Sequence, residues 1–166
     1  MNPLPEIAVF STGGTFNKVY NPLTGTLEID PEAKALREIM KRWLCRFELH
    51  TLLHKDSLDL DDTDRETLIR TIRQSGARKV LVVHGTDTID RTASVLEAKI
   101  PDRQILLTGA MIPYSIDPVE ATANFASAVG WLLGNDTLGI YIALHGLILP
   151  HRSIYKNREK GIFLPR

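Results

Sequence analysis

The sequence lacks several features that mark common classes of protein. It holds one cysteine, Cys45, in 166 residues, so no disulfide can form within the chain, which fits a reducing compartment. Its 20 Lys and Arg balance its 20 Asp and Glu, so it has no basic excess of the kind typical of nucleic-acid-binding proteins. No apolar run approaches the roughly 18 residues that span a bilayer, and the N-terminal residues 1–6 lack the basic and apolar segments of a signal peptide. We therefore expect a cytoplasmic protein that binds neither nucleic acid nor membrane.

The usual signatures of cofactor sites are also missing. Neither G-x-G-x-x-G nor G-x-x-x-x-G-K-[ST] occurs, so a nucleotide-binding loop is not indicated. The Asp-rich run from Asp56 to Asp64 lacks the Gly and the closing Glu of a calcium-binding EF-hand. Four histidines belong to no fuller metal-binding motif and are interpreted as structural or surface residues: His50, His54, His145 and His151. The sequence predicts no metal and no organic cofactor.

What is present is typical of a soluble, folded domain. Hydrophobic residues make up 43% of the chain and charged residues 24%, close to the average for globular proteins. A chain of this size buries roughly 70% of the surface that it exposes when unfolded, which is enough for a hydrophobic core. Because about 150 residues form one domain on average, and no linker or internal repeat is visible, we expect residues 1–166 to form a single domain.

Predicted strands alternate with predicted helices along the chain. Apolar runs, and one alternating segment at 47–53, predict strands at residues 7–10, 47–53, 80–83, 105–107 and 139–144. Helical spacing of apolar residues predicts helices at residues 36–43, 68–72, 89–96 and 119–133. Residues 16–29 predict a β-hairpin flap around an Asn-Pro-Leu-Thr-Gly turn. This order indicates an α/β fold, a three-layer sandwich with a largely parallel central sheet, Rossmann-like or flavodoxin-like.

Three helices can be predicted in more detail. Thr63-Asp64-Arg65-Glu66 has the form of a capping box, which places a helix start at Thr63. The helix after Asp30-Pro31 has an apolar face formed by Leu36, Ile39, Met40 and Trp43. The helix at 119–133 is predicted from the spacing of Val119, Ala123, Ala126, Val129 and Leu133.

The most unusual residues follow three of the predicted strands. Open parallel sheets bind their ligands at the carboxyl ends of the strands, so these residues are the candidates for function. The three loops are Ser11-Thr12-Gly13-Gly14-Thr15, His84-Gly85-Thr86-Asp87-Thr88 and Thr108-Gly109-Ala110-Met111. Each loop places a hydroxyl beside glycine. Small residues let backbone N–H groups approach a ligand, and a hydroxyl can donate a hydrogen bond or act as a nucleophile.

Each of these residues also fits an ordinary structural role. The Thr-Gly-Gly-Thr segment could be a simple turn, and Asp87 could cap a helix. Two polar residues outside these loops have ordinary interpretations as well. Ser57, in an Asp-rich neighbourhood, could be a turn serine, and Lys156 could be a solvated lysine in a charged tail. The joint placement of the three loops at strand ends nevertheless favours a functional site.

Two of these loops resemble the signature motifs of the bacterial-type L-asparaginases and related amidohydrolases. They are Thr12-Gly13-Gly14-Thr15 and His84-Gly85-Thr86-Asp87-Thr88, and their separation is also similar. Residues 108–113 resemble the family's Gly-Ala-Met-Arg-Pro segment, residues 56–60 the segment with a carboxylate-binding serine, and residues 152–156 the stretch with a catalytic lysine. The resemblance extends over nearly the whole chain.

The resemblance implies a catalytic role for five residues. Thr15 would be the nucleophile, and Tyr20 would be the flap tyrosine that lies close to it. Thr86, Asp87 and Lys156 would form a second catalytic group. In that group Asp87 holds the substrate's ammonium, and a partly neutral Lys156 draws a proton from Thr86.

Other residues would bind the substrate, if the resemblance holds. Ser57 would bind the α-carboxylate, and backbone N–H groups in the loops of Gly14 and Thr86 would stabilise the oxyanion. The carbonyl of Ala110 would orient the departing nitrogen. His84 would orient its loop by hydrogen bonding and would not act as a base.

The implied reaction is the conversion of L-asparagine to L-aspartate and ammonia through a threonine acyl-enzyme. Most relatives carry a second, smaller α/β domain that has no counterpart in this sequence. Leu58 and Ile112 stand where many relatives have a polar residue and Arg, so we expect substrate affinity and selectivity to differ. Family relatives are dimers or tetramers, which predicts a homo-oligomer.

Two alternatives remain open at this point. One is a related glutaminase or amidase that acts on another amide and delivers ammonia within a larger assembly. Asparagine and glutamine differ by one methylene, which is worth only about 1–3 kcal/mol of discrimination. The other alternative is a catalytically silent domain that binds an amino acid. The complete set of Thr15, Thr86, Asp87 and Lys156 argues against silence, because binding alone does not need both threonines and the lysine.

Overall fold

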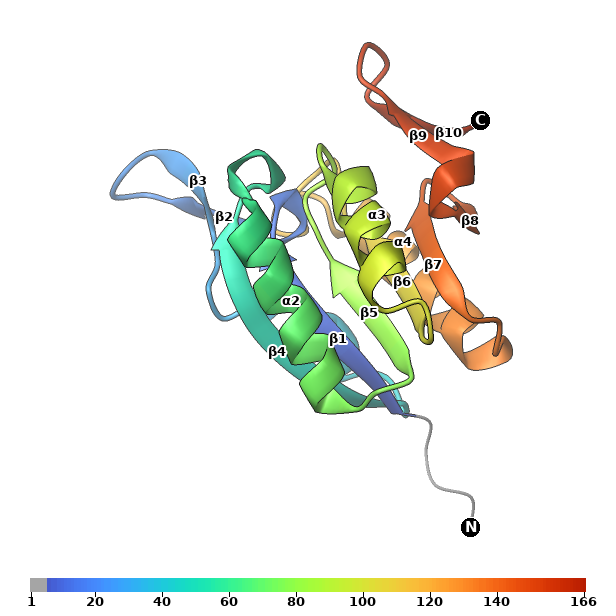
Figure 1. Cartoon of the computed structure of the whole chain (residues 1–166). Helices are drawn as coiled ribbons and strands as arrows, with labels where there is room; N and C mark the ends of the chain where they lie inside the picture. The colour runs from blue at the N-terminus through green and yellow to red at the C-terminus, as the bar shows by residue number, and fades with distance from the viewer. Residues whose placement is uncertain (1–5) are drawn as a thin grey trace.

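The structure, a computed structural model, describes residues 6–166 (Figure 1). The N-terminal segment where no signal peptide is predicted lies, except for Glu6, outside the described residues. A six-stranded sheet forms the centre of the molecule, in the order β4-β1-β5-β6-β7-β8. Its strands are β1 (Glu6–Gly13), β4 (Arg46–Lys55), β5 (Lys79–Val83), β6 (Gln104–Thr108), β7 (Gly139–Leu144) and β8 (Leu147–Pro150). The first five are parallel, and β8 pairs antiparallel with β7.

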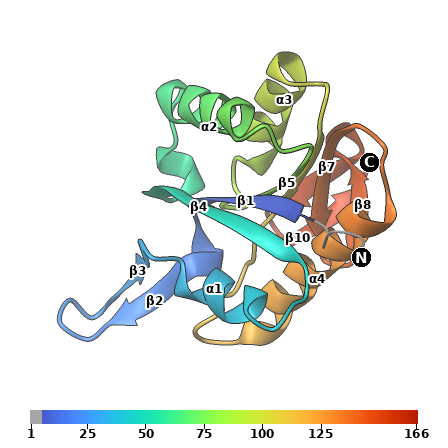
Figure 2. The same cartoon turned by 90° about the horizontal axis from the view of Figure 1, so that it is seen from below.

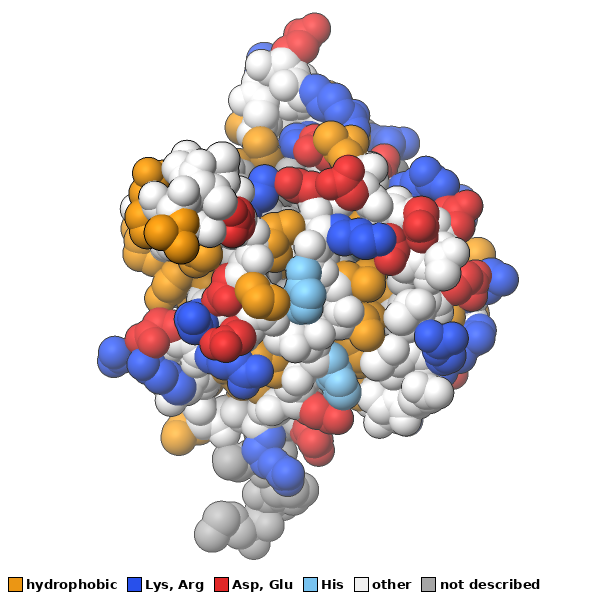
Figure 3. All heavy atoms as spheres, turned by 90° about the vertical axis from the view of Figure 1, so that its left-hand side faces the viewer, with side chains coloured by type: hydrophobic (Ala, Val, Ile, Leu, Met, Phe, Trp, Pro, Cys, Tyr) orange, Lys and Arg blue, Asp and Glu red, His pale blue; other side chains and the backbone are white. Residues whose placement is uncertain are grey.

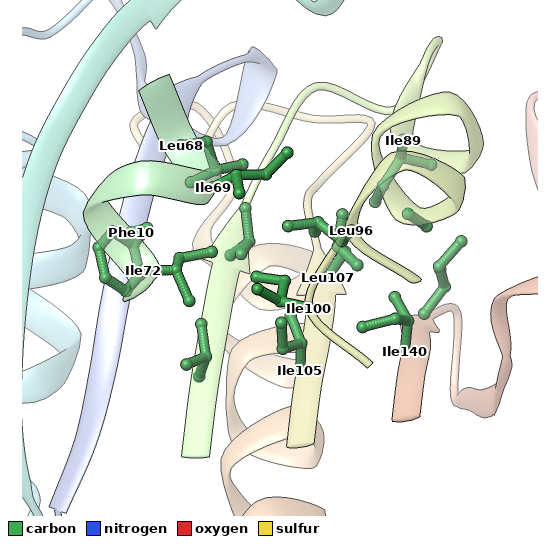
Figure 4. Packing of buried hydrophobic residues seen from close by; sticks show 14 of the residues in the cluster. Phe10, Leu68, Ile69, Ile72, Ile89, Leu96, Ile100, Ile105, Leu107 and Ile140 are labelled. Carbon is green, nitrogen blue, oxygen red and sulfur yellow. The ribbon is translucent and has the colours of Figure 1, made fainter. Parts of the chain in front are cut away.

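Helices cover both faces of this sheet (Figure 2). One face carries α2 (Asp62–Ser75) and α3 (Ile89–Lys99), and the other carries α1 (Lys34–Met40) and α4 (Pro118–Gly134). Successive residues of a strand point to opposite faces, so β1 sends Phe10 into the first core and Val9 into the second. Figure 4 shows the first core, where Phe10 lies near Ile72 and Leu96 lies over Leu107. The predicted three-layer α/β fold is confirmed.

The order of the parallel strands is flavodoxin-like. Numbered along the chain without the hairpin strands, the five parallel strands follow the order 2-1-3-4-5. The direction of winding reverses between β1 and β5, and folds of this kind bind ligands at that switch point. The first two of the three motif-bearing loops leave the sheet at this position.

Two hairpins project from the sheet. The predicted flap is formed by β2 (Lys18–Asn21) and β3 (Thr26–Ile29), after a short 3-10 helix, η1 (Thr15–Asn17). The second hairpin, of β9 (Ile154–Asn157) and β10 (Ile162–Pro165), follows η3 (His151–Ser153) and pairs Lys156 with Phe163. The sequence pattern around Lys156 suggested only a charged tail, because strands of four residues give little periodicity. Another 3-10 helix, η2 (Ser57–Asp59), follows β4.

Some predicted details of the helices are wrong. Helix α1 ends at Met40, so Trp43 lies beyond it and packs edge-on against Phe125, which explains its apolar spacing. Helix α2 begins after Asp61, whose carboxylate accepts the N–H of Asp64 at 2.8 Å. The capping box therefore starts two residues before Thr63.

The face of α4 that packs on the sheet differs from the spaced apolar residues that predicted this helix, except at Val129. Val119 is 71% exposed, whereas Asn124 is 3% exposed. The helix is apolar on more than one side, so spacing alone did not identify the face in contact with the sheet. The other buried positions are Ala121, Phe125, Ala128 and Leu132. Asn124 is buried because its amide donates to the carbonyl of Gly109 at 2.9 Å and its oxygen accepts the N–H of His145.

Candidate active site

The loops that follow β1 and β5 touch through their glycines. Gly13 and Gly14 have φ of 107° and 77°, in the region that favours glycine. A Cβ on Gly14 would lie 2.6 Å from the Cα of Gly85, so no other residue fits there without displacing the second loop. The buried hydroxyl of Thr12 donates to the carbonyl of Val83 at 3.2 Å and ties the same strand ends together. The Thr-Gly-Gly-Thr motif thus brings its last residue next to the His-Gly-Thr-Asp-Thr motif.

Thr15, the predicted nucleophile, begins η1 and is partly exposed. Within residues 6–166 its hydroxyl has no hydrogen-bond partner, and neither does its backbone N–H. Because Gly14 packs on Gly85, Thr15 and Thr86 flank the contact between the two loops. An unpartnered hydroxyl and N–H at such a place are free to meet a ligand.

Thr86, Asp87 and Lys156 form a direct cluster. The ammonium of Lys156 donates to the Thr86 hydroxyl at 2.9 Å and to the Asp87 carboxylate at 2.7 Å. The Lys156 side chain is only 11% exposed, so its charge is compensated by a close pair. The Thr86 hydroxyl in turn lies 3.3 Å from the sulfur of Met111. A cavity of about 170 Å³ adjoins this cluster on the side of β9 and β10.

Asp87 is therefore not a helix cap. The residue before α3 is Thr88, and it makes no capping hydrogen bond with its side chain. Arg158 donates to the backbone carbonyl of Asp87 at 2.8 Å, which adds a second link from the C-terminal hairpin to this loop. The Asp87 side chain, 37% exposed, keeps room for another partner beside Lys156.

Ser57 is buried beneath the same loop. Its hydroxyl oxygen accepts the N–H of Asp87 at 3.2 Å and of Thr88 at 3.3 Å, and its carbonyl accepts the Thr88 hydroxyl at 2.7 Å. Two accepted hydrogen bonds use both lone pairs of the hydroxyl. Its own hydrogen has no acceptor within residues 6–166 and is left to donate to a ligand.

The loop after β6 presents a free carbonyl at Ala110. Ala110 is 1% exposed, and its carbonyl accepts no hydrogen bond from residues 6–166. The next two backbone N–H groups, of Met111 and Ile112, both donate to the carboxylate of Glu120, at 2.9 and 3.0 Å. The loop is therefore held firmly while one acceptor stays available.

Gly14 contributes through its conformation. Its N–H donates to the carbonyl of Lys55 at 3.0 Å, and its carbonyl accepts the N–H of Asn17 at 3.2 Å. Both polar groups are thus engaged within the protein. Two backbone N–H groups that have no partner in the described chain, those of Thr15 and Thr86, are able to bind an oxyanion.

The structure does not bring Tyr20 to Thr15. Tyr20 lies on β2 of the flap, with 63% of its surface exposed, and its side-chain hydroxyl has no hydrogen-bond partner in the described chain. In Figure 3 the flap forms the lobe at the upper left, and apolar side chains gather on it. They include Val19, Leu23 and Leu27, all exposed.

His84 lies under the loop as a neutral ring. Burial lowers the pKa of His84 from 6.5 to about 4. Its Nδ1 donates to the carbonyl of Gly85 at 2.7 Å, and its Nε2 accepts the hydroxyl of Thr92 at 2.8 Å. As predicted, His84 orients the loop by hydrogen bonding. Arg65, 3% exposed, completes this network by donating to Thr92 and Thr88.

Sequence reasoning missed four residues that support the site. They are Arg65, Thr92, Glu120 and His145, whose partners belong to other elements or loops and are linked to them by no local motif. A charged residue inside an otherwise buried helix face, as at Arg65, is the one local signal that could have been used.

Two further observations concern other classes of site. Within residues 6–166, no three His, Cys, Asp or Glu side chains come together in a way that could hold a metal ion. None of the helices in this part of the chain is long and apolar enough to cross a membrane.

Comparison with known proteins identifies a family and several distant relatives. The family described as "Asparaginase, N-terminal" matches residues 6–162. The chain is 24% identical over 150 residues to the probable L-asparaginase 4 of Schizosaccharomyces pombe, covering 82% of this chain and 41% of that protein. It is 27% identical over 163 residues to one of the subunits of the glutamyl-tRNA(Gln) amidotransferase of Methanococcus vannielii, covering 89% of this chain and 36% of that protein.

Solved structures show the same fold. The thermostable L-asparaginase from Thermococcus kodakarensis superposes with a TM-score of 0.82 at 24% identity, over 96% of this chain and 51% of that one. The probable cytoplasmic L-asparaginase from Campylobacter jejuni gives 0.79 at 26% identity, over 97% and 53%. This chain thus spans about half the length of these relatives, or less. It belongs to the asparaginase family and matches the N-terminal part of the family's longer members.

Proposed function

We propose that this chain hydrolyses the side-chain amide of L-asparagine to L-aspartate and ammonia, through an acyl-enzyme on Thr15. The observation that carries the proposal is the contact of Lys156 with both Thr86 and Asp87, at 2.9 and 2.7 Å, beside the loop of Thr15. A hydroxyl, an amine and a carboxylate in one cluster can move a proton and hold an ammonium group.

The free groups around the site match the parts of asparagine. Asp87 would bind the α-ammonium, and the hydrogen of the Ser57 hydroxyl would bind the α-carboxylate. The N–H groups of Thr15 and Thr86 would stabilise the oxyanion, and the Ala110 carbonyl would accept a hydrogen from the leaving nitrogen. Apart from Asp87, each of these groups has no hydrogen-bond partner in the described chain that would take the place of the substrate. Asp87 is bound to Lys156 but is partly exposed, so it can also contact the substrate.

The reaction balances in two steps. The Thr15 oxygen attacks the amide carbon, its proton passes to the leaving nitrogen, and ammonia departs to leave an aspartyl ester. Water then attacks the ester carbon and returns a proton to the Thr15 oxygen. Lys156 would exchange a proton with the Thr86 hydroxyl, to which it is hydrogen-bonded at 2.9 Å.

A second candidate is an amidase that acts on glutamine or another amide and supplies ammonia to a partner. The match to the amidotransferase of Methanococcus vannielii favours it, because that match is as extensive as the match to the asparaginase of Schizosaccharomyces pombe. The two candidates share the nucleophile and differ in the size of the substrate.

Self-association is part of the same proposal. The flap, the loop before α4 and the first turn of α4 expose large apolar side chains, among them Tyr20, Leu23, Ile116 and Val119. Patches of this kind are typical of contact surfaces. Light scattering should give the mass of a dimer or a larger oligomer, and the mass of one chain would contradict this part.

Ammonia release from L-asparagine and L-glutamine tests the main proposal. The wild-type chain should release ammonia, and Thr15→Ala should release none while remaining folded by circular dichroism. Thr137→Ala, an exposed threonine at the opposite end of the sheet, is the matched control and should keep full activity. Activity that survives in Thr15→Ala would overturn the nucleophile. Release from glutamine alone would select the second candidate.

A further inference from the structure

Two segments that contribute to the site, which we call its two arms, are both hydrogen-bonded to one pair of side chains outside it, Glu120 and His145. The first arm is the loop of Ala110, held by the carboxylate of Glu120. The second is the hairpin that carries Lys156. Between them lies His145, whose Nε2 is 3.2 Å from the Glu120 oxygen Oε1 and whose Nδ1 accepts the N–H of Phe163 at 3.0 Å.

The hydrogen bond to Glu120 fixes the direction of the Ala110 carbonyl. In a trans peptide the C=O of one residue and the N–H of the next point in opposite directions within one plane. The N–H of Met111 belongs to the same peptide unit as the carbonyl of Ala110, and it donates to Glu120 at 2.9 Å. The Ala110 carbonyl must therefore point away from Glu120. Ile112 donates to the second oxygen of the carboxylate at 3.0 Å, so the carboxylate cannot rotate freely.

His145, the second member of the pair, binds β10, the strand that pairs with the strand of Lys156. Phe163 is the cross-strand partner of Lys156 in the β9–β10 hairpin. The Phe163 N–H is directed away from β9 and donates to His145, and the two rings pack edge to face at 5.9 Å. Because Nδ1 accepts this hydrogen bond, the single ring hydrogen lies on Nε2 and is donated to Glu120.

The backbone of His145 is held in place at some cost. His145 and Gly146 form the two-residue turn between β7 and β8, and His145 has φ of 53°, which is uncommon outside glycine. Its N–H donates to the buried side chain of Asn124 at 3.2 Å. Strained backbone of this kind persists where surrounding contacts require it, and such residues cluster at functional sites.

We infer that Glu120 and His145 are a positioning pair, which aims the Ala110 carbonyl at the leaving nitrogen and couples it to the hairpin that carries Lys156. This inference rests on the proposed function. The carbonyl accepts a hydrogen from a departing amine, whereas the oxygen of a departing alcohol has lone pairs in that place. The pair therefore matters for amide hydrolysis and much less for ester hydrolysis.

The test compares L-asparagine with the β-methyl ester of L-aspartate, since both give the same acyl-enzyme. For each substrate kcat/KM reports the step up to that intermediate. Glu120→Gln places an NH2 group against at least one of its donors, and we expect about a tenfold to hundredfold loss in kcat/KM for the amide, the range seen for outer residues that orient a reacting group. The ester should change by no more than about twofold. Equal losses for both substrates would show a merely structural role and overturn the inference.

Matched controls separate the pair from its surroundings. Glu159→Gln changes an exposed carboxylate at the tip of the same C-terminal hairpin and should leave the amide-to-ester ratio unchanged. His145→Gln retains a donor toward Glu120, whereas His145→Asn retains an acceptor for Phe163. Each variant should therefore lose only one of the two hydrogen bonds, to Glu120 or to Phe163. Each should also change the amide-to-ester ratio of kcat/KM less than Glu120→Gln does.

Amide-proton exchange gives a readout that needs no substrate. Exchange at Met111 should speed up in Glu120→Gln, and exchange at Phe163 should speed up in His145→Gln but not in His145→Asn. Unchanged exchange at Met111 in Glu120→Gln would overturn the inference, whatever the activity. If the wild-type chain hydrolyses neither substrate, the proposed function fails by itself, and the exchange pattern alone decides whether the pair orients the two arms.

Discussion

The two sides of the candidate site differ in how completely hydrogen bonds within the protein fix their functional groups. On the side of Thr86, hydrogen bonds with Lys156, Ser57 and His84 fix the loop, and most of these groups are buried. On the side of Thr15, the hydroxyl and the N–H of the proposed nucleophile have no hydrogen-bond partner in the described chain, and the flap stands exposed. Catalysis gains most from groups that are already oriented before the substrate binds. The comparison therefore indicates one side that is preorganised and another that the substrate must complete.

The largest effect should follow from loss of the amine on the preorganised side. Lys156→Met keeps the length of the side chain and removes the charge and the donor. Because the amine would transfer a proton in the reaction, kcat for asparagine should fall by about 10²–10⁴-fold. Lys160→Met, an exposed lysine at the tip of the same hairpin, serves as the control and should keep the wild-type kcat. A loss of less than about threefold in Lys156→Met would remove the cluster from the mechanism.

The support beneath this side should fail on acidification. Burial lowers the pKa of His84 from 6.5 to about 4, so the unfolded chain binds a proton at a pH where the folded chain does not. The contribution of His84 to stability is fully present above about pH 6.5 and is lost as the pH falls toward 4. It amounts to about 3 kcal/mol at most.

Urea unfolding at several pH values between 7 and 4 measures this loss. His84→Asn retains a donor for the carbonyl of Gly85 and does not titrate, so its free energy of unfolding should start lower at pH 7 and fall less steeply. Carboxylates shared by both proteins cancel in the difference. His54→Asn, at an exposed histidine, should run parallel to the wild type. Equal slopes for His84→Asn and the wild type would contradict the assignment of a neutral, buried ring.

How much was predictable from the sequence differs between the two sides as well. The strand-end loops are local motifs, so Thr15, Thr86 and Asp87 could be named, and apolar runs identified the central strands. Lys156 was named only through the family resemblance, because its four-residue strand carries no periodic signal. Glu120, His145 and Arg65 were missed since their partners belong to other elements or loops and no local motif links them. The buried face of α4 was missed for a related reason, since Asn124 is polar and is buried only by its bonds to two loops.

The smallest effect in this series concerns the open side and its flap. Tyr20→Phe removes one hydroxyl from a residue that is 63% exposed, so the free energy of unfolding should change by less than about 0.5 kcal/mol. If the flap closes over bound substrate and brings this hydroxyl to Thr15, kcat should still fall by about tenfold or more. Leu23→Ala, at the 94% exposed tip of the same flap, is the control for changes in the flap that spare the hydroxyl. A fall in kcat only in Tyr20→Phe would show that the open side is completed by closure. Full activity in Tyr20→Phe would instead mean that Thr15 finds its base elsewhere, and the preorganised side, with Lys156 and Thr86, would be the place to look for it.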